Sequence, residues 1–148
     1  MVASANIIRD TIFFVKDFLD GEVTDPISST RPANEKFIMT SYPSRAVTYP
    51  LITIKDLNTS GSMTLGFQSE ASLVELQIEV RVWANNIKDR DNIADDIFDT
   101  LRLNQVGTSG TSQANNLHDL QLLSSVNVDE DNGSKSKVMT FKFVFVAE

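Results

Sequence analysis

The chain has 148 residues, of which 41% are hydrophobic and 22% charged, and this balance predicts one globular domain over residues 1–148. A formal net charge of −7 and the absence of a Lys/Arg cluster argue against specific nucleic-acid binding, which needs cations to neutralise phosphates. Because the chain contains no cysteine, disulfide scaffolds, thiolate metal sites and cysteine nucleophiles are excluded.

The N-terminal segment predicts an amphipathic helix over about residues 4–20. Ser4 is a candidate N-cap and Gly21 a candidate stop for this helix. Charged residues interrupt the apolar run, so we expect neither a signal peptide nor a membrane span, and a soluble protein made in a cytoplasm. The apolar residues at helical spacing are Ile8, Ile12, Val15 and Leu19, with Ile7, Phe14 and Phe18 beside them.

The next segment predicts a loop followed by two short strands. Residues 21–36 combine glycine and proline with serine, threonine and asparagine, which favours a loop. Residues 37–42 and 51–55 are strand candidates, each bounded by a proline. Residues 58–70 then connect to the next strand, and their alternating apolar side chains predict a hairpin arm.

Residues 73–103 carry the clearest pattern of the chain. The first part alternates apolar and polar residues, a period of two that predicts a strand with one buried face. The apolar residues of this strand are Val74, Leu76, Ile78, Val80 and Val82. The period then changes to four, since Ile93, Ile97 and Leu101 fall on one stripe, and this predicts an amphipathic helix over about residues 88–103.

Two strands follow residues 107–113, which predict a flexible loop. Apolar residues alternate over 120–128 and again over 138–146, and residues 131–134 between them form a reverse-turn signal, Asp-Asn-Gly-Ser. The second of these strands is apolar on both faces, so we expect it to be central in the sheet or covered by a partner. The predicted order is α-β-β-β-α-β-β, an α+β sandwich of two layers with a mostly antiparallel sheet.

The chemistry-bearing residues form no catalytic grouping. His118 is the single histidine and has no cysteine or second histidine as a partner, so we expect it at the surface. Residues 129–131 are acidic and are expected in a turn. No phosphate-binding glycine loop or G-x-S-x-G elbow is present, and the chain is predicted not to be an enzyme and to need no cofactor. The helix at 88–103 presents a run of carboxylates, interpreted as a solvated face with weak divalent binding at a subunit contact as the alternative: Asp89, Asp91, Asp95, Asp96 and Asp99.

Apolar residues in the predicted loops indicate an interface instead. Met63, Leu65 and Phe67 alternate in the candidate arm, and Ile27 lies in the earlier loop. They either dock onto another subunit or fold back over their own sheet. Trp83 is on the polar side of its strand, where a helix covers it or where it anchors a subunit or tube interface.

Three segments carry a likeness to a known family. A proline-led strand (YPLITIKDL) precedes a long strand that ends in an aromatic-small-polar turn (VELQIEVRVWANN), and a helix follows (KDRDNIADDIFDTLRL). The corresponding features are Pro50 to Ile54, Trp83 to Asn85 and Ile93 to Leu101. Their order, from about Ile7 to Val146, resembles the tail terminator (tail completion, or head-to-tail joining) proteins of long-tailed bacteriophages and related viruses.

The resemblance implies a structural virion protein that forms a ring, usually a hexamer. Such a ring caps the finished tail tube, ends its polymerisation and joins the tail to the head connector. Its partners would be further copies of the chain, the tail tube protein and a head-closure or connector protein. DNA would pass through the lumen without specific binding, and the acidic balance of the chain fits a lumen that repels phosphates. The family offers no catalytic residues, metal site or membrane contact, and assembly is expected in the host cytoplasm.

Two other interpretations stay open. The chain could be a different neck or tail component, namely a head-closure protein or a tube subunit, whose assembly would be open rather than closed. It could also be a small α+β ligand-binding module, although the sequence shows no cluster of aromatic and polar residues that would define a pocket.

Overall fold

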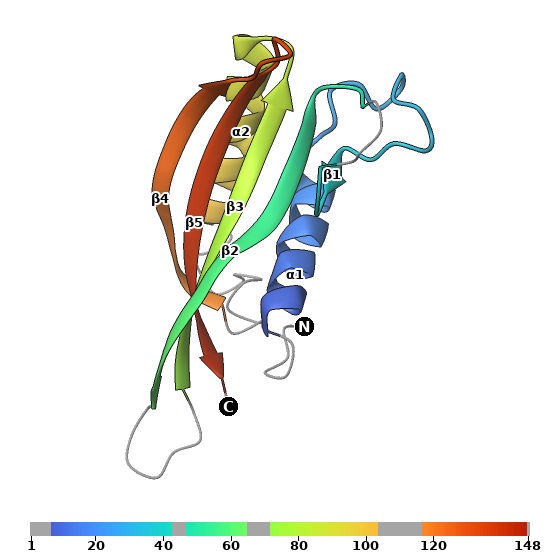
Figure 1. The fold of residues 1–148 in the computed structure, drawn as a ribbon. Coiled ribbons are helices and arrows are strands. Elements are labelled where there is room, and N and C mark those ends of the chain that lie inside the picture. Colours follow the sequence, from blue (N-terminus) through green and yellow to red (C-terminus); the bar gives the residue numbers. More distant parts are fainter. Residues whose placement is uncertain (1–6, 43–46, 65–71, 104–116, 148) are drawn as a thin grey trace.

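The computed structural model describes residues 7–42, 47–64, 72–103 and 117–147, which form two layers (Figure 1). The elements are α1 (Ile7–Glu22), β1 (Ile38–Met39), β2 (Leu51–Thr64), β3 (Ser72–Ala84), α2 (Ile87–Leu103), β4 (Leu117–Asp129) and β5 (Lys135–Ala147). The sheet order is β1-β2-β3-β5-β4; β1 runs parallel to β2, and all other neighbours are antiparallel. This confirms the predicted α+β class and element order.

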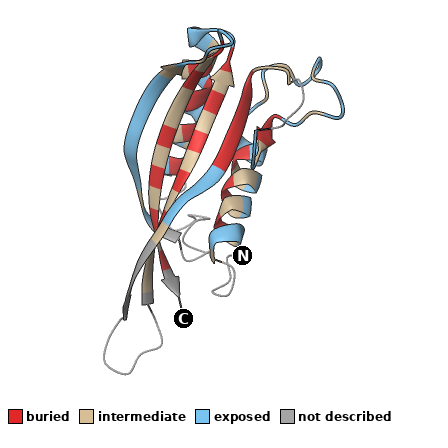
Figure 2. Cartoon of the chain, viewed as in Figure 1, coloured by how far each residue is buried: buried red, intermediate tan, exposed pale blue. Residues whose placement is uncertain are grey.

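The core lies between one face of the sheet and the two helices. Along β3, Leu76, Ile78, Val80 and Val82 are buried while their neighbours are half-buried, as Figure 2 shows. The predicted stripe of α2 is buried against this face and so is part of α1, because apolar side chains leave water on both layers. The helical members of the core are Val15, Leu19, Ile93, Ala94, Ile97 and Leu101.

The strand β5 occupies the interior of the sheet, between β3 and β4. Phe141, Phe143 and Phe145 point into the core and are at most 1% exposed. Phe141 lies in register with Ile78 of β3 and with Leu122 of β4. This interior position confirms the first of the two expectations for the strand, and Val138 and Val144 on its other face are half-buried.

Local hydrogen bonds fix the start of α2 and the turn before β5. Asn86 accepts the backbone N–H of Asp89 at 2.8 Å and donates its side-chain amide to the Asp89 carboxylate at 2.9 Å, a reciprocal helix cap. In the predicted reverse turn, Gly133 has a φ of 85° and donates its N–H to the Glu130 carbonyl at 3.0 Å. Glycine adopts this left-handed backbone without a steric cost.

Helix α1 differs from its prediction at its C-terminal end and at one position of its apolar stripe. The helix runs through Gly21 to Glu22, because the N–H of Val23 still bonds the Leu19 carbonyl at 2.8 Å. The candidate N-cap Ser4 lies outside the described residues. Ile8 is 44% exposed, since the buried line of the helix starts one turn later, at Thr11. Neither described helix is long and apolar enough to span a membrane.

The first two strands also differ from their predicted lengths. The strand predicted over 37–42 is reduced to β1, with two residues. In contrast, β2 extends well beyond residue 55 to Thr64, because its second half pairs with β3 from Gln77 to Ser72. Serine, threonine and glycine in that half suggest a turn, but ladder pairing keeps them extended. Residues 65–70, the remainder of the predicted arm, lie outside the described part.

Candidate functional surface

The carboxylates of α2 engage protein cations or solvent. No group of three His, Cys, Asp or Glu residues able to hold a metal ion occurs among the described residues. Asp91 Oδ1 accepts hydrogen bonds from Arg90 Nε at 2.9 Å and Lys137 Nζ at 3.0 Å, and these bonds lower the pKa of Asp91. Asp95 and Asp99 are exposed. This arrangement supports the solvated-face interpretation of the acidic run.

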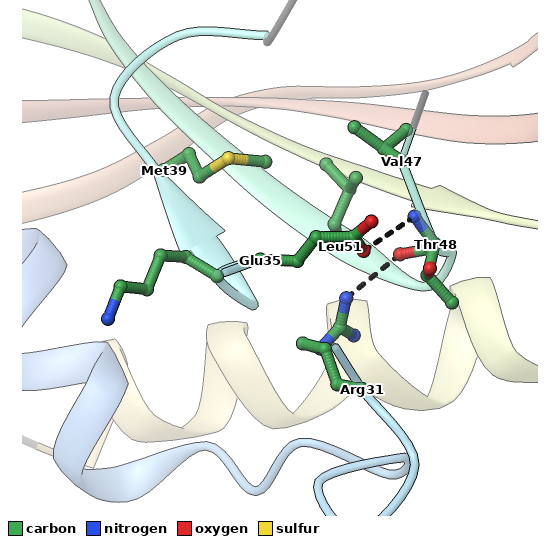
Figure 3. A pocket seen from close by; sticks show the side chains of 7 residues that line it. Arg31, Glu35, Met39, Val47, Thr48 and Leu51 are labelled. Carbon is green, nitrogen blue, oxygen red and sulfur yellow. Dashed lines mark hydrogen bonds between the residues drawn. The ribbon is translucent and has the colours of Figure 1, made fainter. Parts of the chain in front are cut away.

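A buried ion pair fixes the loop between α1 and β1. The side chain of Arg31 is 5% exposed, and its Nε donates to Asp25 Oδ2 at 2.6 Å while Nη2 donates to Asp25 Oδ1 at 3.1 Å. The same guanidinium donates to the backbone carbonyl of Thr48 at 2.8 Å, as Figure 3 shows, and to the backbone carbonyl of Pro50. Glu35 accepts the N–H of Thr48 at 3.0 Å. Because every Arg31 nitrogen is bonded within the protein, the cluster is an anchor for the loops rather than a ligand site.

The Asp25–Arg31 pair predicts a loss of stability in acid. Burial raises the pKa of Asp25, but the bonds from Arg31 and from the Ile27 N–H outweigh it, so the folded pKa lies below the ordinary 3.8. The stabilisation is present above pH 3.8 and is lost as pH falls through the lower folded value. Thermal melts of wild type and Asp25→Asn should therefore converge as the pH is lowered through this range. A constant gap between the two would contradict the assignment.

Trp83 is covered by the protein itself, and not by a helix. Its ring packs against Tyr42 with centroids 4.7 Å apart, and Arg81 lies over it at 4.2 Å. Its indole N–H donates to the hydroxyl of Thr53 at 3.1 Å. Burial and a 2.6 Å hydrogen bond to the Tyr49 hydroxyl raise the pKa of Tyr42 to about 12. This cluster attaches Tyr42 and Tyr49, which precede β2, to the open face of the sheet, meaning the face opposite the helices.

The other proposed interface residues are not brought together among the described residues. Ile27 is half-buried in the anchored loop, and its N–H donates to Asp25 Oδ1 at 3.0 Å. The backbone of Met63 pairs with Leu73 near the end of β2. Leu65 and Phe67 lie outside the described part.

The sheet face opposite the helices carries paired charges. Among the described residues it has three ion pairs: Lys55 with Glu79 at 3.6 Å, Lys142 with Glu75 at 3.0 Å, and Arg81 with Glu130. Both helices, in contrast, carry more carboxylates than cations, so the acidic excess of these elements lies on the helical layer.

The edge strand β4 carries exposed apolar side chains. Figure 2 shows it exposed along most of its length. Leu122, Leu123 and Val126 are 37%, 45% and 53% exposed. The helices pack mainly on β1, β2, β3 and β5, and in β4 Leu120 packs against the core while Gln121 to Asn127 are exposed. The sequence predicts this strand, but its exposure follows from its place at the edge.

Comparisons with known proteins place the fold. No protein-family model and no curated protein sequence matches the chain. Among solved structures, a chain described as "Virion of native gene transfer agent (GTA) particle" is similar, with a TM-score of 0.58 and 10% sequence identity. The match covers 90% of this chain and 92% of that chain. A likeness at this identity shows a shared fold.

Proposed function

We propose that this chain is a structural protein of a virion, and that it forms a ring which caps the tail tube and joins the tail to the head. The observation that carries the proposal is the fold shared, over nearly the full length of both chains, with a chain of a gene transfer agent particle. The strand and helix patterns at Pro50–Ile54 and Ile93–Leu101, which resemble tail terminator proteins, point the same way. The role requires surfaces for other subunits and no catalytic centre.

The charge distribution bears on which face would meet DNA. A lumen lined by the open sheet face would present paired cations and carboxylates, whereas a lumen lined by helices would be acidic. A surface of paired charges lets a polyanion pass without holding it, because no excess of cations releases counterions from the phosphates. The open sheet face is therefore suited to line a DNA channel without an acidic lining. Met63, Leu65, Phe67, Trp83 and Ile27 stay proposed contacts with the tube or with other subunits.

The proposal predicts a closed ring of about six copies and control of tail length. Light scattering should give a defined oligomer of the 16.4 kDa chain, and negative-stain images should show rings. In a tail-assembly reaction, omission of the protein should give overlong tails without heads, and its addition should restore uniform, head-competent tails. Open filaments would indicate a tube protein instead. Normal tail length without the protein would contradict the terminating role.

A further inference from the structure

The outer edge of β4 lacks the charges and prolines that usually protect an edge strand over most of its length, and its pairing with β5 is irregular only at 119–120 and at Leu123. The strand has 13 residues, and from Gln121 to Val128 it contains neither a charged residue nor a proline. No described strand pairs with this outer edge. Protein edges are normally blocked by charges, prolines or covering elements, because free N–H and C=O groups recruit further strands. With an unpaired outer edge and three exposed apolar side chains, β4 can pair with a further strand.

The opposite edge of the sheet is open as well. The short β1 pairs only with Ile52 and Thr53, so β2 has no described partner on its outer side from Ile54 to Thr64. Leu57, at an irregularity of this strand, is 42% exposed. The sheet therefore has an unpaired stretch of strand on both sides, at β4 and at residues 54–64 of β2, and Leu57 and Leu122 there are exposed.

The directions of these two strands make them compatible. In the order β2-β3-β5-β4 every neighbour is antiparallel, so β2 and β4 run in opposite directions. A rotation about an axis along the strands preserves direction, so β4 of one copy meets β2 of the next as an antiparallel pair. Such a head-to-tail contact closes into a ring when the rotation closes.

The register of the sheet determines which residues of β4 and β2 would meet in this contact. Leu122 pairs with Phe141, Phe141 with Ile78, and Ile78 with Asp56, the residue next to Leu57. Leu57 and Leu122 thus lie at the same height on opposite edges of the sheet. The same rotation keeps that height, and it brings Leu122 of one copy to Leu57 of the next.

We infer that β4, from Gln121 to Val128, adds to residues 54–64 of β2 in a second copy of the chain. The inference rests on the proposed ring and names the surfaces that would build it. Pairing of two β4 strands about a twofold axis at Ser124 fits less well, because Asp119 of each copy would face Asp129 of the other. That arrangement would also leave both β2 edges unpaired.

Blocking each edge separately tests the inference. Leu57→Lys and Leu122→Lys should each remain at the 16.4 kDa monomer mass under conditions where the wild type assembles. An equimolar mixture should form a dimer and stop, because each variant retains the edge that the other lacks. Leu103→Lys, at a site 58% exposed at the end of α2, is the matched control and should assemble as wild type. Circular dichroism should show that all three variants are folded.

Each other outcome overturns the inference. Assembly of Leu57→Lys alone would indicate β4–β4 pairing, and a mixture that stays monomeric would show that the two edges do not meet. If the wild type and both variants form rings, the ring stands and the edge contact is wrong. If the wild type is monomeric at every soluble concentration, the edge contact is also wrong, and the tail-assembly reaction then decides the proposed function independently.

Discussion

Replacing Arg31 with alanine is expected to destabilise the fold by about 3–5 kcal/mol, because it leaves the Asp25 carboxylate partly buried without its cation. The change also removes the donors that hold the carbonyls of Thr48 and Pro50. Urea unfolding followed by circular dichroism measures the loss. Arg102→Ala is the control, because Arg102 and Asp99 are both more than half exposed and such pairs contribute about 0–1 kcal/mol.

A second variant separates loss of the ion pair from loss of packing. The double substitution Asp25→Asn with Arg31→Met removes the unpaired charge and keeps an apolar side chain, so it should recover part of the stability lost in Arg31→Ala. Equal midpoints for Arg31→Ala and Arg102→Ala would show that the buried pair contributes no more than a surface pair.

Phe141→Ala is expected to cost about 3–5 kcal/mol, out of roughly 5–15 kcal/mol for a domain of this kind. Phe141 is fully buried on β5, in register with Ile78 on one side and Leu122 on the other. The truncation therefore opens a cavity in the centre of the core. Phe13→Ala makes the same chemical change at a site 48% exposed on α1 and should cost about 0.5 kcal/mol or less.

Denaturant midpoints of these two phenylalanine variants measure the difference. A similar small loss in both would mean that the core can collapse around the missing ring. A similar large loss would mean that Phe13 is covered in solution, for example by another subunit, and the midpoint of Phe13→Ala should then depend on protein concentration.

The elements that the sequence predicts best are those with a strong period. β3 and α2 were expected close to their observed bounds, because Leu76 to Val82 alternate and Ile93 to Leu101 recur every four residues. The second half of β2 is predicted from the sequence as part of a hairpin arm at 58–70, because serine, threonine and glycine there favour turns while Met63, Leu65 and Phe67 alternate. Its strand conformation comes from pairing with β3, a contact that composition does not report.

The candidate surface was harder to predict because it depends on contacts between distant residues. The Asp25–Arg31 pair lies in a loop, where two charges six positions apart have no periodic signature. Trp83 was expected to contact a helix or a partner, and its cover, Tyr42, comes from a segment assigned to a short strand. The apolar alternation in residues 120–128 predicted a strand, but whether it is central or at an edge is set by the pairing of β5 with β3.

The interior position of β5 sets the order in which the sheet can be completed. The residues of β3 that face β5, from Ser72 to Ala84, find their partners only in residues 135–147. During synthesis, β2, β3 and both helices emerge before this strand exists, so the core lacks its three central phenylalanines until late. The pairing is long-range and slow to form. A growing chain therefore acquires its β4 edge only together with a finished core, so the proposed contact between subunits would form only after folding is complete.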